Sequence, residues 1–244
     1  MMLDGRTILI TGAARGLGRA IALACAGAGA RLVLADIDEA CADTAGETGA
    51  RFIRVDLGEP ASITALAEDI GAREGVLHGL CNNAAIATNV GGMGFEDIEL
   101  DLWDRVMRVN IRGTWLVTRA CAPMLRESGS GRIVNVASDT ALWGAPRLLS
   151  YTASKGAVIA MTRSLSRELG PDRVGVTCVA PGILTTESTE YVPEARHKLY
   201  ADGRAVPGPQ SAEEVTETIA FLMSEPALTL TGQVLPLNNG FVFA

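Results

Sequence analysis

A tyrosine and a lysine four residues apart are the side chains in this sequence best suited to acid–base chemistry. Tyr151 and Lys155 lie in the helix-like run YTASK, where this spacing places the phenol and the ammonium on one face. Although the chain has 21 Lys and Arg residues, only Lys155 and Lys198 are lysines, so the pairing is improbable by chance. A phenol ordinarily has a pKa of about 10, so we expect nearby positive charge to favour the phenolate of Tyr151. An exposed Tyr/Lys pair on a helix surface is the alternative interpretation.

A glycine-rich turn follows the first apolar run of the chain. Residues 11–18 read TGAARGLG, directly before an Ala/Leu-rich segment of helical period. Glycines at a strand-to-helix turn allow a ligand to approach the backbone closely, and the N–H groups at the start of the helix attract a pyrophosphate. Gly12, Gly16 and Gly18 are therefore predicted to cradle a dinucleotide, with a bare structural turn as the alternative.

Asp36 stands 18 residues after Gly18, at the end of the second strand-like run. If the turn holds a dinucleotide, this carboxylate accepts hydrogen bonds from both hydroxyls of the adenine ribose and repels a 2′-phosphate. The strength of such bonds predicts a preference for NAD over NADP of about one to two orders of magnitude. Arg15 argues the other way, because a cation in the turn can also reach a 2′-phosphate. An Asp that merely ends a strand is the structural alternative.

The elements that must position these residues alternate along the chain. Short apolar, β-branched runs are separated by longer segments of helical period, which is typical of a parallel sheet covered by helices on both faces. The pattern predicts an α/β fold, a Rossmann-type doubly wound sheet formed by residues 1–244 as one domain. A single helix is expected over 102–127, and the polar segment 185–210 is expected to be a long substrate loop. The predicted strands are Thr7–Thr11, Arg31–Ala35, Arg51–Val55, Leu77–Asn82, Arg132–Ala137, Val174–Ala180 and Gln233–Leu237.

Composition narrows the class of protein. A chain of 244 residues that is 48% hydrophobic can bury one sizeable core. The N-terminal run lacks the features of a secretory signal, and no segment is long and apolar enough for a membrane helix, so a cytoplasmic protein without a membrane partner is expected. A net charge of −7 argues against a nucleic-acid partner. The five widely spaced cysteines are predicted to be core residues, and the two histidines bring no ligand motif, so no metal site is expected.

These motifs, with several others, resemble those of the short-chain dehydrogenases/reductases. The others are Asn82-Asn83-Ala84-Ala85, Asn110, Ser138 and Pro181-Gly182, in the family's order and spacing. The resemblance implies seven parallel strands with helices on both faces, a homotetramer or homodimer, and hydride transfer between NAD(H) and a small-molecule alcohol or ketone. Three positions depart from the usual family pattern: Ala85 replaces a glycine, His78 replaces a common acidic residue, and Asn238 stands where aspartate is frequent.

By position, the resemblance also implies a role for each site residue. Tyr151 is the acid/base, Lys155 also holds the nicotinamide ribose, Ser138 hydrogen-bonds the substrate oxygen, and Asn110 anchors a water in a proton relay. A capping serine and a buried structural asparagine are the alternatives for the last two. The residues expected around the cofactor are Gly12, Arg15, Gly16, Leu17, Gly18, Asp36, Asp56, Leu57, Asn83, Tyr151, Lys155, Pro181, Gly182, Leu184 and Thr186.

The substrate is less sharply indicated. The candidate wall residues Asp139, Leu142, Trp143 and Leu148, with residues 187–207, include no cluster of cations for a phosphate or a carrier protein. This favours a small neutral alcohol or ketone, cyclic or aromatic, although Trp143 is equally consistent with a core position. An NADPH-dependent 3-oxoacyl carrier-protein reductase, which Asp36 disfavours, and a sugar or polyol dehydrogenase are alternatives. A more distant one is a non-catalytic NAD-sensing protein, which would be expected to have lost one of the catalytic side chains.

Overall fold

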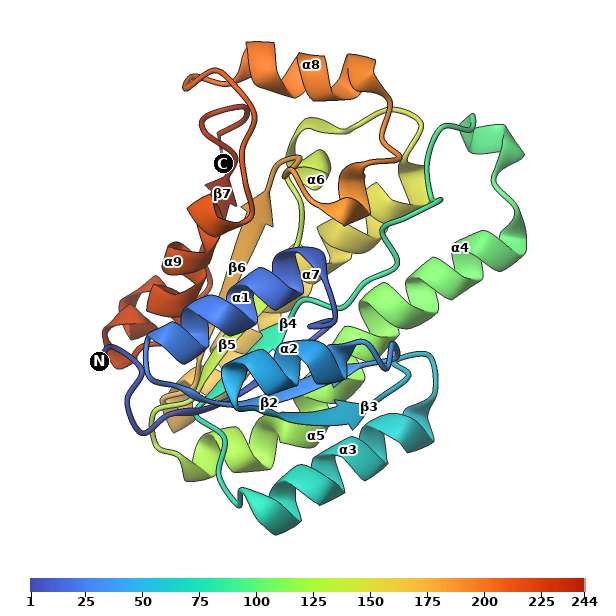
Figure 1. Ribbon diagram of the computed structural model, residues 1–244. Helices are drawn as coiled ribbons and strands as arrows, with labels where there is room; N and C mark the ends of the chain where they lie inside the picture. Colours follow the sequence, from blue (N-terminus) through green and yellow to red (C-terminus); the bar gives the residue numbers. More distant parts are fainter. Residues whose placement is uncertain (244) are drawn as a thin grey trace.

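Seven parallel strands form a single sheet in the computed structural model, which describes residues 1–243 (Figure 1). The strand order is β3-β2-β1-β4-β5-β6-β7, so the chain winds outward from β1 to β3, crosses back to β4 and winds outward again to β7. The predicted doubly wound α/β fold is confirmed, and every predicted strand end lies within two residues of the observed one. The strands are β1 (Thr7–Thr11), β2 (Arg31–Asp36), β3 (Arg51–Arg54), β4 (Gly79–Asn82), β5 (Arg132–Val136), β6 (Gly175–Pro181) and β7 (Val234–Leu237).

Helices cover both faces of this sheet, with α1, α2 and α9 on one side and α3, α5 and α7 on the other (Figure 1). Shorter elements join them at the edge of the sheet where the strands end. The α-helices are α1 (Gly16–Gly27), α2 (Cys41–Thr48), α3 (Pro60–Arg73), α4 (Leu100–Val106), α5 (Thr114–Glu127), α6 (Thr140–Trp143), α7 (Leu149–Leu169), α8 (Glu194–Gly203) and α9 (Glu213–Leu222). Short 3₁₀ helices are η1 (Phe95–Asp97), η3 (Gly170–Asp172), η4 (Glu187–Thr189) and η5 (Glu225–Leu230), and η2 (Met107–Gly113) is a π-helical turn.

The sheet is buried on both faces because its central strands are apolar on both. In β1 the side chains of Ile8 and Ile10 enter one hydrophobic cluster and that of Leu9 enters the other, as the alternation of a strand requires. All five cysteines lie in the described part of the chain and are buried and free, which confirms that they are core residues. Among residues 1–243, no helix combines the length and apolar character needed to cross a membrane.

Two expectations about the helices need correction. The helix predicted over 102–127 is interrupted by the π turn η2, where the side chain of Asn110 binds the backbone of Ile86. The segment 185–210 is not a loop throughout, because it contains η4 and the ten-residue helix α8. Tyr200 is the one buried residue of α8, so this helix lacks the apolar periodicity from which a helix is predicted.

Candidate active site

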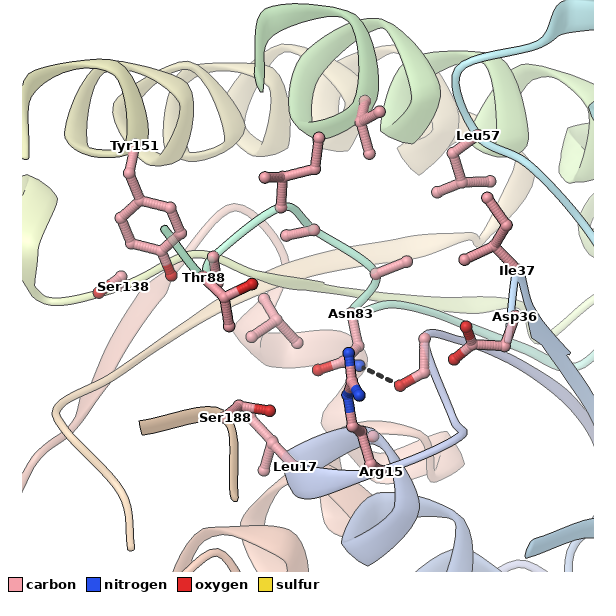
Figure 2. Close-up of a pocket in the computed structure, with 18 of the residues that line it drawn as sticks. Arg15, Leu17, Asp36, Ile37, Leu57, Asn83, Thr88, Ser138, Tyr151 and Ser188 are labelled. Atoms are coloured by element: carbon pink, nitrogen blue, oxygen red, sulfur yellow. Dashed lines mark hydrogen bonds between the residues drawn. The ribbon is translucent and has the colours of Figure 1, made fainter. Parts of the chain in front are cut away.

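The glycine-rich turn joins β1 to α1 and is packed too tightly for side chains at two of its glycines. Gly12 has a φ of +70°, and a Cβ there would lie 2.7 Å from the Cα of Ala84. A Cβ at Gly18 would lie 1.8 Å from the carbonyl oxygen of Gly12. The amide of Asn83 fastens the turn by donating to the carbonyls of Thr11 at 3.1 Å and Gly12 at 2.9 Å (Figure 2). Only glycine fits both positions, as a cradle for a pyrophosphate requires.

A cavity of about 550 Å³ extends from this turn to Ser138 and Tyr151 (Figure 2). It brings together most of the residues predicted from the sequence. Among the predicted catalytic and cofactor residues of the described chain, Gly16, Gly182 and Asn110 do not line it. Those that do are Gly12, Arg15, Leu17, Gly18, Asp36, Asp56, Leu57, Asn83, Ser138, Tyr151, Lys155, Pro181, Leu184 and Thr186.

The two glycines outside the cavity have packing roles instead. A Cβ at Gly16 would lie 3.0 Å from the hydroxyl of Ser188, and Gly16 has a φ of +55°. A Cβ at Gly182 would lie 3.0 Å from a carboxylate oxygen of Asp139. Gly182 therefore makes room for a buried acid, and its contact with a cofactor stays a prediction.

Several residues line the cavity that the sequence did not indicate. Ile37 follows Asp36, and Arg105, Arg108 and Val109 share one face of the helix formed by α4 and η2, a spacing that could have indicated them. Thr88 lies in the loop after β4 and belongs to no motif. The remaining unpredicted residues are sequence neighbours of predicted ones.

Asp36 is held in place before any ligand binds. Its Oδ2 accepts a hydrogen bond from the backbone N–H of Ala14 at 2.9 Å, and its Oδ1 accepts one from Asp38 at 3.0 Å. Each carboxylate oxygen has a second lone pair, so Asp36 can still accept ribose hydroxyls. Arg15 projects into the same part of the cavity (Figure 2), where it remains the residue that argues for NADP.

Tyr151 and Lys155 lie one turn apart on α7. The Nζ of Lys155 lies 5.6 Å from the centre of the Tyr151 ring and donates a hydrogen bond to the carbonyl of Val136 at 2.7 Å. Burial lowers the pKa of Lys155 to about 8. Burial also raises the pKa of Tyr151, and a hydrogen bond with Ser138 only partly offsets this, while the charges of Tyr191 and Asp139 raise it further. The protein's own groups therefore raise the pKa of the phenol, and the expected effect of positive charge from Lys155 and a bound nicotinamide stays a prediction.

Ser138 follows β5 and lies beside the hydroxyl of Tyr151 (Figure 2). Its Oγ accepts hydrogen bonds from the hydroxyl of Thr140 at 2.9 Å and from the backbone N–H of Thr140 at 3.3 Å. The hydrogen bond from the Thr140 N–H is of the kind expected if Ser138 were only a capping serine, the alternative given in the sequence analysis. Because both contacts use the serine oxygen as acceptor, its proton is left to donate into the cavity.

Asn110 lies behind the cavity in the π turn and is almost fully buried. Its Oδ1 accepts the N–H of Ile86 at 2.7 Å, and its Nδ2 donates to the carbonyl of Ile86 at 3.1 Å and to the hydroxyl of Ser154 at 3.1 Å. Ser154 in turn donates to the backbone carbonyl of Tyr151 at 2.7 Å. Asn110 thus ties the loop after β4 to the start of α7, and its role in a water relay stays a prediction.

The candidate substrate wall differs in part from the prediction. In the described structure none of Asp139, Leu142, Trp143 and Leu148 lines the cavity, whereas Ser188 and Thr189 of the predicted segment 187–207 do. The small, uncharged loop residue Thr88, after β4, lies near Tyr151 (Figure 2), while Ser188 lies beside Gly16 at the glycine-rich turn. The hydroxyl of Tyr191 donates to the carbonyl of Ala87, so the segment before α8 reaches across to the loop after β4.

Comparison with known proteins gives consistent matches along the whole chain. A family model described as Enoyl-(Acyl carrier protein) reductase matches residues 12–242. The chain is 35% identical to a 3-alpha-(or 20-beta)-hydroxysteroid dehydrogenase of Mycobacterium bovis, over 98% of this chain and 90% of that protein. It is 32% identical to a 3-oxoacyl-[acyl-carrier-protein] reductase of Thermotoga maritima, over 99% and 100% of the two chains. A solved 3-ketoacyl-(acyl-carrier-protein) reductase from Brucella melitensis, complexed with NADH, superimposes with a TM-score of 0.90 at 32% identity, covering 98% of this chain and 99% of that one.

Proposed function

Because this chain belongs to the short-chain dehydrogenase/reductase family and is an oxidoreductase acting on CH–OH groups, we propose that it uses NAD(H) with a small neutral alcohol or ketone. The observation that carries the proposal is that Ser138, Tyr151 and Lys155 line the cavity that begins at the glycine-rich turn. When bound, the dinucleotide supplies the hydride acceptor or donor. The turn at Gly12 and Gly18 fits its pyrophosphate, because both residues line the cavity at the start of α1, where helix N–H groups attract an anion.

Three side chains handle the proton at the substrate oxygen. The Ser138 hydroxyl donates a hydrogen bond to that oxygen, and Tyr151 gives or takes the hydroxyl proton as the carbon changes oxidation state. The raised pKa of Tyr151 suits it as a proton donor for carbonyl reduction. In the oxidation direction Tyr151 must lose its proton, which requires a positive charge nearby, and Lys155 carries one below about pH 8. Asn110 holds the start of α7 in register with the loop after β4 through Ser154.

Asp36 selects the cofactor in this proposal. Its pre-oriented carboxylate accepts the two hydroxyls of the adenine ribose and repels a 2′-phosphate, which favours NAD. The Brucella melitensis reductase, which was solved with NADH, supports the use of the unphosphorylated dinucleotide. Titration with NADH and NADPH, followed by nicotinamide fluorescence, tests the choice, and tighter binding of NADPH would contradict it.

For the substrate, a cyclic secondary alcohol or the matching ketone is supported by the name of the Mycobacterium bovis relative and by the small, uncharged loop residue Thr88 near Tyr151. The second candidate is a 3-oxoacyl thioester, supported by the name of the Thermotoga maritima relative. A panel of cyclic, aromatic and polyol alcohols with NAD⁺, run beside acetoacetyl thioesters with NADH and NADPH, separates the two. Activity confined to carrier-linked substrates would eliminate the first candidate.

The acid/base assignment has its own test. We expect Tyr151→Phe to abolish turnover, because no other hydroxyl on α7 reaches the substrate oxygen in this proposal, while NADH binding stays within about twofold. Substantial remaining activity in Tyr151→Phe would refute the assignment.

We also propose a homotetramer, or a homodimer, that acts in the cytoplasm. Large apolar side chains on α4, α5 and α7 are exposed, among them Leu100 at 78%, Trp115 at 44% and Leu149 at 45%. Burial of such a face between copies of the chain would remove it from water. Light scattering coupled to size-exclusion chromatography measures the assembly, and a monomer at micromolar concentration would contradict this part.

A further inference from the structure

The residue after Ser138 is a fully buried acid. Asp139 is 0% exposed, and its backbone N–H donates to the carbonyl of Pro181 at 3.0 Å. One carboxylate oxygen accepts the hydroxyl of Tyr200 on α8 at 2.7 Å. The other accepts the amide of Asn238, just after β7, at 3.2 Å. A single carboxylate therefore joins the serine turn, α8 and the C-terminal segment, which are far apart in the sequence.

From this geometry we propose that Asp139 is a positioning residue, whose carboxylate fixes α8 through Tyr200 and thereby places the segment 185–210 over the substrate end of the cavity. The catalytic part of this inference rests on the proposed function. The structural part, that Asp139 holds α8, does not.

The hydrogen bond from Tyr200 to Asp139 is a buried tertiary contact of α8. Tyr200 is the buried residue of this helix, and its ring stacks on Phe241 at 4.1 Å between centroids. Its hydroxyl also accepts a hydrogen bond from the indole N–H of Trp143 at 3.1 Å. Burial and the charge of Asp139 both raise the pKa of Tyr200, so the hydroxyl remains a donor to the carboxylate. By contrast, the hydrogen bond that Arg196 on α8 donates to the carbonyl of Pro146 is exposed.

The placement of α8 affects the cavity through the residues that precede this helix in the sequence. Thr186, Ser188 and Thr189 line the cavity, and the ring of His197 on α8 lies 3.1 Å from the carbonyl of Thr189. On the other side, the N–H groups of residues 205 and 206 bind carbonyls of residues 240 and 239, so the segment after α8 follows the C-terminal turn (Figure 1). Tyr191, in the same segment, donates to the carbonyl of Ala87 in the cavity wall, and its charge acts on Tyr151. A shift of Tyr200 relative to Asp139 would therefore move Tyr191 and the other residues of this segment that line the cavity.

The amide of Asn238 makes a buried carboxylate at position 139 compatible with its surroundings. The family frequently has aspartate at position 238, and a carboxylate there would face Asp139 at a distance of about 3 Å, where like charges repel. This chain has an amide at 238, which donates to Asp139 instead. The charged and titratable groups that face Asp139 are Tyr200 on α8, Arg204 just after it and Tyr151 on α7, whose pKa is raised in part by the charge of Asp139.

Amide hydrogen exchange at pH 7 tests the attachment without any assay of activity. Tyr200→Phe keeps the ring and removes the hydroxyl, so we expect peptides from 185–210 to exchange roughly ten- to a hundredfold faster, as loss of a hydrogen bond to a charged group implies. Lys198→Gln, an exposed change on the same helix, is the control and should exchange like the wild type. Exchange in Tyr200→Phe that matches the control would overturn the proposal.

A second variant, Asn238→Asp, tests the proposal independently in case Tyr200→Phe does not fold. Asn238→Asp replaces the donor with a like charge, so we expect faster exchange in 185–210 at pH 7. Adding Asp139→Asn to Asn238→Asp removes the repulsion and restores a donor–acceptor pair, so exchange should slow again. Faster exchange that Asp139→Asn does not reverse, or no change in Asn238→Asp, would count against the anchor.

Enzyme kinetics then distinguish an effect of Asp139 and Tyr200 on the substrate site from an effect on protein stability alone. In Tyr200→Phe the KM for the alcohol should rise about tenfold or more, while the Kd for NADH changes by less than about twofold. In Asp139→Asn the pH profile of kcat/KM should move to lower pH, because a negative charge that opposes the Tyr151 phenolate is gone. An unchanged KM and pH profile would overturn the link to the substrate site. A wild-type protein with no NAD(H)-dependent activity would refute the proposed function, and hydrogen exchange would still decide the role of Asp139.

Discussion

Replacement of Asp139 by asparagine should change how the stability of the protein depends on pH. Burial raises the pKa of Asp139 to about 6, against the hydrogen bonds of Tyr200 and Asn238, the charge of Arg204 and the N–H of Thr140. Its ordinary value is 3.8, so the carboxyl is about two units harder to ionise in the folded protein. At about 1.4 kcal/mol per unit, ionisation of Asp139 costs the folded state about 3 kcal/mol.

The direction of the effect follows from the raised pKa. Below about pH 4 the carboxyl is neutral in both states, and its favourable contribution is fully present. As pH rises through the folded-state pKa of about 6, that contribution is lost. Asparagine does not titrate, so the free energy of unfolding of Asp139→Asn, minus that of the wild type, should rise by about 3 kcal/mol between pH 4 and pH 7.

Urea unfolding at half-unit steps of pH, at one protein concentration, measures this difference. Subtracting the wild type cancels the titration of every other carboxyl, and equal m values in the two proteins would show that the transitions are comparable. Tyr191→Phe, which removes a hydroxyl without adding or removing a group that titrates in this range, serves as the control and should give a flat difference. If the difference in unfolding free energy between Asp139→Asn and the wild type also did not change with pH, the hydrogen-bond donors to Asp139 would fully offset the effect of burial on its pKa. That result would refute the predicted pH dependence.

Three further predictions concern the cofactor end and Lys155. Asp36→Ala should reduce the preference for NADH over NADPH by about one to two orders of magnitude, measured by fluorescence titration of both. Gly12→Ala should weaken NADH binding at least about tenfold, because its Cβ would lie 2.7 Å from the Cα of Ala84 at a φ that alanine disfavours; unaltered affinity would contradict the cradle. Lys155 has a lowered pKa of about 8 and is charged only below it, so kcat/KM in the oxidation direction should fall as pH rises above about 8. A profile that stays flat to pH 10 would contradict the role of its charge.

The sheet and the cofactor turn could be predicted because their signals are local. The strands are short, continuous apolar runs, and Gly12 has a positive φ of +70° that itself favours glycine. The same holds for the Tyr151 and Lys155 pair, whose relation is fixed by one helical turn. Where a residue's role depends on its nearest neighbours in sequence, the pattern is sufficient.

The parts that could not be predicted depend on contacts between distant segments. Helix α8 is stabilised by Tyr200, which packs against residues about 60 positions earlier and 40 later, so its own mostly polar sequence predicted a loop. The π turn at Asn110 exists because both ends of its amide bind Ile86, a pairing that periodicity does not reveal. Asp139 was a candidate for the substrate wall by position, and only the fold shows that it faces away from the cavity toward α8.

The cost of Asp139 at neutral pH is itself an argument for a function. A buried acid whose ionisation lowers stability by about 3 kcal/mol is replaceable by a neutral residue of similar shape without that loss. Its neighbours have accommodated it nonetheless: Gly182 leaves space for it, Asn238 donates to it, and Tyr200 remains protonated beside it. Stability is commonly lower where a strained or charged group serves activity. The benefit consistent with this arrangement is a fixed α8 and a defined charge near Tyr151. A neutral replacement of Asp139 that gains stability at pH 7 should therefore hold α8 less firmly and should lack the charge near Tyr151.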